Sequence, residues 1–168
     1  MNIGWNISKL TAKIILSFLV VYKLSLAQEA VAPNNATPTT VVEHEYDEVP
    51  GVVVRIVELK RTANNTVTLR WAYRNTGSDV VELHNSARHY ALADNHYLLD
   101  MVDKKQYFGV EQGNGYPLAR NHGGEVMLDP GKEYVMWLRF PAPPSNVDKI
   151  DVYIDRVSEP FEAVQITK

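Results

Sequence analysis

Strict alternation of apolar and polar side chains is the feature that most constrains the fold of this chain of 168 residues. In Thr66–Arg74 the apolar residues fall at every second position, and the same period recurs in Glu133–Phe140. Such a period places successive side chains on opposite faces of a strand, so both segments predict half-buried strands of an antiparallel sheet. No segment after residue 27 has the 3.6-residue period of an amphipathic helix.

Turn sequences separate further segments of strand character. Val52–Leu59 is rich in β-branched residues, and turn residues stand at Asn64–Asn65, Asn75–Ser78 and Asp129–Gly131. Shorter strands are predicted at 80–83, 90–92, 97–101, 105–110, 126–128, 150–154 and 161–166, with a long loop at 111–124. This spacing predicts an all-β fold, an immunoglobulin-like antiparallel β-sandwich of about 7–9 strands, with a small barrel as the alternative.

The N-terminal segment has the three parts of a secretory signal peptide. Lys9 and Lys13 precede the apolar run Ile14–Tyr22, and small residues lead up to Ala27. Because a membrane span needs about 20 apolar residues, this short run predicts cleavage after Ala27, with Ala30 as the second choice, over an uncleaved anchor. We therefore expect a periplasmic or secreted protein.

Cleavage would leave an acidic chain in two parts. Residues 1–27 form the predicted signal peptide, residues 28–48 a flexible linker, and residues 49–168 the sandwich domain. Removing three lysines changes the net charge from −3 to about −6, which argues against nucleic acid as a partner. The chain has no cysteine, so we expect neither disulfides nor a lipid-modified cysteine, and no membrane anchor after cleavage.

Three stretches of the chain resemble exported bacterial domains with an immunoglobulin-like sandwich. They are VELKRTANNTVTLRWAYRNTGSDVVEL and LDPGKEYVMWLRFPAPPSNVDKIDVYI, followed by the closing PFEAVQI. The chain is similar to DUF4352-type domains and to the sandwich domain found beside peptidoglycan-binding OmpA-like modules. The resemblance implies the sandwich fold and an exported location, and it implies no catalytic residue.

Histidines and acidic residues give two weak metal hypotheses. His84, His89 and His96 lie near predicted turns and are the candidate ligands of a periplasmic metal-binding module. No cysteine or His-x-His pair supports them, so exposed loop histidines are the simpler interpretation. Asp94, Asp100, Asp103 and Glu111 lack calcium-loop spacing, and the acids around Asp100 are expected to set a turn.

Catalytic motifs are absent from the sequence, which has no Gly-x-Ser-x-Gly, no cysteine and no phosphate-binding glycine loop. We therefore expect no enzyme activity and no cofactor. The expected function is that of a non-catalytic binding or accessory module of the bacterial envelope, acting through loops 84–97 and 105–124 on a protein or polysaccharide partner. A carbohydrate- or peptidoglycan-binding module that uses exposed aromatics is the alternative. The candidate contact residues are Tyr97, Tyr107, Phe108, Tyr116, Arg120 and Trp137.

Overall fold

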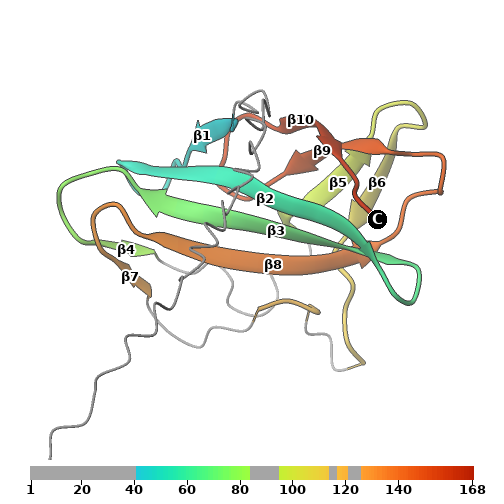
Figure 1. Ribbon diagram of the computed structural model, residues 1–168, viewed down its shortest axis with the longest axis horizontal. Coiled ribbons are helices and arrows are strands. Elements are labelled where there is room, and N and C mark those ends of the chain that lie inside the picture. The colour runs from blue at the N-terminus through green and yellow to red at the C-terminus, as the bar shows by residue number, and fades with distance from the viewer. Residues whose placement is uncertain (1–40, 84–94, 114–116, 121–125) are drawn as a thin grey trace, which may run out of the picture. The chain divides into compact units, whose positions relative to one another are not determined.

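A computed structural model of the chain describes residues 41–83, 95–113, 117–120 and 126–168 (Figure 1). Its regular structure is nearly all β, with every pairing between strands antiparallel. Ten strands lie in the described residues: β1 (Glu43–Glu45), β2 (Val52–Thr62), β3 (Thr66–Asn75), β4 (Val81–Leu83), β5 (Tyr97–Asp100), β6 (Lys105–Phe108), β7 (Val126–Leu128), β8 (Glu133–Pro141), β9 (Lys149–Tyr153) and β10 (Phe161–Gln165). The predicted all-β class is confirmed.

The first sheet has the order β1-β2-β3-β8 and contains the two strands with the clearest alternation. In β3, Val67, Leu69 and Trp71 are completely buried, whereas Arg70 between them is exposed. In β8, Leu138 and Phe140 are buried in the same way. One face of this sheet therefore enters the core, as the alternation predicts.

The second sheet has the order β10-β9-β5-β6, and β4 and β7 form a separate two-stranded sheet. Leu98 of β5 and Val152 of β9 are directly paired and completely buried. They belong to the same core cluster as Trp71 and Phe140 of the first sheet. Side chains from both sheets thus share one hydrophobic core.

Asn75 joins two turns at the end of β3. Its side chain is fully buried, and Nδ2 donates to the carbonyl oxygens of Asp79 at 2.7 Å and Leu128 at 2.9 Å. Its Oδ1 accepts from the Gly77 N–H at 2.9 Å, and its backbone carbonyl accepts from Gly131 N–H. The two predicted turns, Asn75–Ser78 and Asp129–Gly131, are therefore held together by one side chain.

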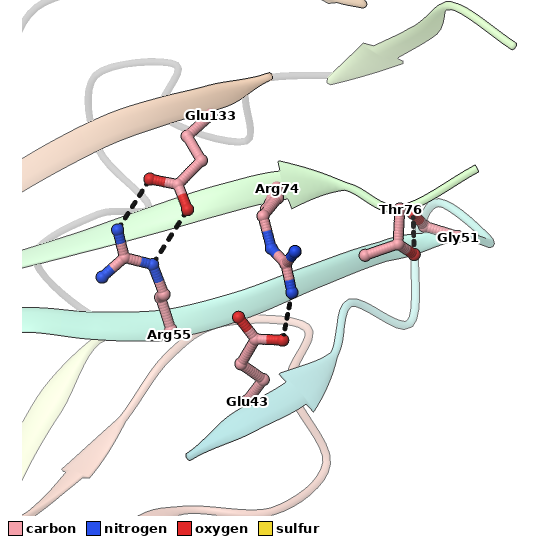
Figure 2. A network of polar contacts seen from close by, with 6 residues as sticks. All are labelled: Glu43, Gly51, Arg55, Arg74, Thr76 and Glu133. Atoms are coloured by element: carbon pink, nitrogen blue, oxygen red, sulfur yellow. Dashed lines mark hydrogen bonds and ion pairs between the residues drawn. The ribbon is translucent and has the colours of Figure 1, made fainter. Parts of the chain in front are cut away.

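Ion pairs cross the outer face of the first sheet (Figure 2). Arg55 of β2 makes two hydrogen bonds, of 3.0 and 2.7 Å, to the carboxylate of Glu133 on β8, and Arg74 pairs with Glu43 of β1. The hydrogen bonds from Arg55 lower the pKa of Glu133. Because both partners are partly exposed, the Arg55–Glu133 pair contributes only about 1 kcal/mol at most.

Residues 43–48, which the sequence places in the flexible linker, belong to the folded unit. β1 pairs with β2, the His44 ring contacts Phe161 of β10 edge-on at 4.4 Å, and Tyr46 is only 4% exposed. This short segment is polar, so no alternation of apolar and polar residues marks it as a strand. The predicted strand at 90–92 lies outside the described residues.

The described part of the predicted long loop runs alongside β8. Arg120 N–H donates to the Trp137 carbonyl at 3.0 Å, and Arg139 N–H donates to the Leu118 carbonyl at 3.0 Å. These bonds give β8 a partner on the side away from β3. No helix among the described residues is long and apolar enough to cross a membrane.

Candidate binding groove

Three aromatic residues form a row on the second sheet. Tyr97 of β5 is paired with Phe108 of β6 on one side and with Tyr153 of β9 on the other. The Tyr97 and Tyr153 rings stack at 4.3 Å, and the Phe108 ring lies 5.9 Å from Tyr97. The stacked Tyr153 ring covers one face of Tyr97, and the Phe108 ring is tilted by 46° beside it, so little of Tyr97 is open for stacking on a sugar.

The other predicted contact residues lie in different places. Tyr107 is on the inward phase of β6, is 5% exposed and belongs to the hydrophobic core. Trp137 is half-buried on β8, and the Arg120 guanidinium lies 4.7 Å from the Tyr134 ring and donates to the Val135 carbonyl. Tyr116 lies outside the described residues. Of the predicted contact residues that the structure describes, Tyr107 therefore lies in the core and not at the surface.

Of the three histidines in the metal hypothesis, only His96 lies in the described residues. Its ring is 1% exposed and lies 5.1 Å from the Trp71 ring, and neither ring nitrogen has a hydrogen-bond partner among the described residues. Burial lowers the pKa of His96 to about 4, and the negative charge of Asp155 opposes that shift. No cluster of three potential metal ligands occurs within the described ranges.

Asp100 sets a turn, as the sequence predicts. Its Oδ1 accepts hydrogen bonds from the backbone N–H groups of Val102 and Asp103, at 2.9 and 3.3 Å. The turn ends at Lys104, which has a positive φ of 54°. Asp103 and Glu111 are exposed, and Asp94 lies outside the described residues.

An apolar groove opens between β2 and β10, and the sequence-based contact residues do not include it. We call it the β2–β10 groove; its volume is about 690 Å³. Ile56 and Leu59 line it from β2, and Phe161 and Val164 line it from β10. The groove is lined by Val41, Val42, Ile56, Val57, Glu58, Leu59, Phe161, Glu162, Ala163, Val164, Gln165 and Thr167.

The groove follows a stretch of β2 that has no strand partner on its outer side among the described residues. β1 pairs with β2 only as far as Arg55, and the next contact is a parallel bridge from Lys60 to Thr167. Arg61 N–H donates to the Thr167 carbonyl, and Thr167 N–H donates to the Leu59 carbonyl, which closes this end. The edge of β2 between these two contacts borders the groove.

Irregular backbone shapes both walls of the groove. In β2 the register with β3 shifts between Ile56 and Glu58, which turns Val57 outward as a bulge. In β10 the register shifts between Phe161 and Val164, where Ala163 has a φ of 49° and donates its N–H to Asp151 Oδ1 at 2.8 Å. Both walls are thus irregular, β2 by its bulge at Val57 and β10 by the shift before Val164.

Three large apolar side chains that line the groove are exposed. Val41 and Val42 are each 56% exposed and Val57 is 38% exposed. The sequence contains one signal of this site: in Ile56-Val57-Glu58 the alternation of β2 breaks, since an apolar residue takes the outward phase. The break cannot be recognised from the sequence, because the continuous run of β-branched residues around it is also typical of a fully buried strand.

No protein-family model matches this chain, and neither a curated protein nor a solved structure matches it significantly.

Proposed function

We propose that this protein is an exported, non-catalytic binding module of a bacterial envelope, built on an immunoglobulin-like β-sandwich. The observation that carries the binding role is the β2–β10 groove, where three exposed valines lie beside a strand edge that has no partner in the described part of the chain. Soluble domains rarely expose contiguous apolar surface without a use for it. The sandwich assignment is supported by two four-stranded antiparallel sheets that share one core.

Export is expected to remove the first 27 residues. The charged start, the short apolar run and the small residues before Gln28 support this part of the proposal. Expressed with its native N-terminus in a Gram-negative host, the protein should be recovered from the periplasm with Gln28 as its first residue, as measured by intact mass. A protein that retains Met1 would contradict the proposed export.

The binding role is tested by photo-crosslinking in cells. A benzophenone amino acid at Val57, in the groove, should form a crosslink to one identified envelope protein. The matched control is the same amino acid at Val102, which is 89% exposed in the turn after β5 and lies outside the groove. Crosslinks that are equal at the two positions, or none at Val57, would contradict a binding role for the groove.

A further inference from the structure

We propose that the β2–β10 groove binds an extended peptide segment of another protein, with apolar residues at alternate positions and a basic residue beside them. The segment pairs with the free edge of β2 as an added strand. This inference rests on the proposed binding function and names the chemistry of its partner.

The backbone of β2 supplies the first part of the argument. Between Arg55, the last residue paired with β1, and the Lys60–Thr167 bridge, β2 has room for an additional strand. Because the Leu59 carbonyl already accepts the Thr167 N–H, the open stretch is residues 56–58, which at the rise of an extended chain is about three residues, or roughly 10 Å. Exposed edges of this kind bind peptides through main-chain hydrogen bonds, and side-chain pockets provide the specificity.

The side chains that line the groove set the pattern of the partner. Ile56, Leu59 and Phe161 form the apolar floor of the groove, and Leu59 and Phe161 are almost fully buried in the core. The exposed Val41 and Val42 therefore supply most of the apolar surface for side chains from one face of an added strand. Val57 projects from the bulge at the rim. Because successive residues of a strand point to opposite faces, every second residue of the bound segment is apolar and the others face solvent.

Charge favours a basic partner over a second copy of this chain. Glu58 and Glu162 both line the groove. Arg70 lies 3.9 Å from Glu58, whereas Glu162 forms no ion pair with any described residue. A second copy carries the same carboxylates and, once residues 1–27 are removed, the same net charge of about −6, so two copies repel each other, whereas a lysine beside the apolar positions is attracted.

The test uses a defined probe, the peptide acetyl-KVTVTVK-amide, titrated into the protein that begins at Gln28 and followed by calorimetry and by backbone NMR shifts. Shifts should concentrate in β2 residues 56–59. Replacing Val57 by arginine should weaken binding by about tenfold or more, because it blocks the rim and adds a like charge. The control Val102→Arg adds the same charge outside the groove and should leave the affinity unchanged.

Two matched peptides separate strand pairing from simple hydrophobic contact. The same peptide with N-methylated valines keeps its side chains but lacks N–H donors, and should bind about tenfold more weakly or worse. The peptide acetyl-EVTVTVE-amide should also bind more weakly. Glu162→Lys should reduce the difference in affinity between the lysine and the glutamate peptides. Equal binding of the N-methylated peptide, or no effect of Val57→Arg, would overturn the inference.

Other occupants give distinct results. A dimer in sedimentation that Val57→Arg dissociates would show that a second copy fills the groove, and a crosslink from Val57 to residues 28–40 of the same molecule would show that the chain's own segment fills it. Either result overturns the peptide proposal. If a cellular partner is captured at Val57 but none of the peptides binds, the peptide chemistry is wrong while the binding function stands.

Discussion

Replacing Asn75 by alanine is expected to lower the free energy of unfolding by about 3 kcal/mol. The substitution removes two donors and one acceptor from a side chain that is fully buried. The Leu128 carbonyl is left without the Asn75 donor in a buried position, which costs more than the loss of an exposed hydrogen bond. The turn after β3 and the strand β7 should loosen together.

The measurement is urea unfolding at neutral pH, followed by tryptophan fluorescence. Thr76→Ala is the matched control, since it removes the neighbouring side-chain bond to the Gly51 carbonyl at an exposed position (Figure 2). That control should cost less than about 1 kcal/mol. A loss below about 1 kcal/mol for Asn75→Ala, with an unchanged slope against urea, would show that Asn75 does not hold the turns together.

The strands were predictable from sequence because their signal is local. The alternation in Thr66–Arg74 and Glu133–Phe140 corresponds to the buried and exposed faces of β3 and β8. The Asn75 junction was predictable only as a turn, because the side chain binds Leu128, which lies 53 positions further along the chain. A polar residue in a turn sequence looks the same whether its amide faces solvent or a buried carbonyl.

The candidate site was less predictable, for the same physical reason. Tyr107 was expected at the surface, but the phase of β6 is fixed by its pairing with β5, which turns this ring into the core. The groove depends on the end of β1, a bulge in β2 and the last residues of the chain, which meet only after folding. Sequence patterning identifies which residues form strands, but it leaves open which edges remain unpaired.

Mild acid is expected to destabilise the protein through His96. Burial lowers the pKa of His96 from 6.5 to about 4, so the folded chain binds fewer protons than the unfolded chain between these values. The stability is therefore complete above pH 6.5 and is lost as the pH falls towards 4. The total loss from this group is about 3 kcal/mol, of which roughly 2 kcal/mol should appear between pH 7.5 and pH 5.

His96→Leu isolates this contribution, because it replaces the titrating ring beside Trp71 with an apolar side chain of similar size. Urea unfolding at pH 7.5 and pH 5 should show a smaller acid-induced loss in the variant, by roughly 2 kcal/mol. At pH 7.5 the variant should be at least as stable as the parent, since two buried nitrogens without hydrogen-bond partners are gone. His44→Leu, at a partly exposed site on β1, is the control for a general histidine effect. Equal acid sensitivity of the parent and His96→Leu would mean that the carboxylates, and not this buried ring, govern the response to acid.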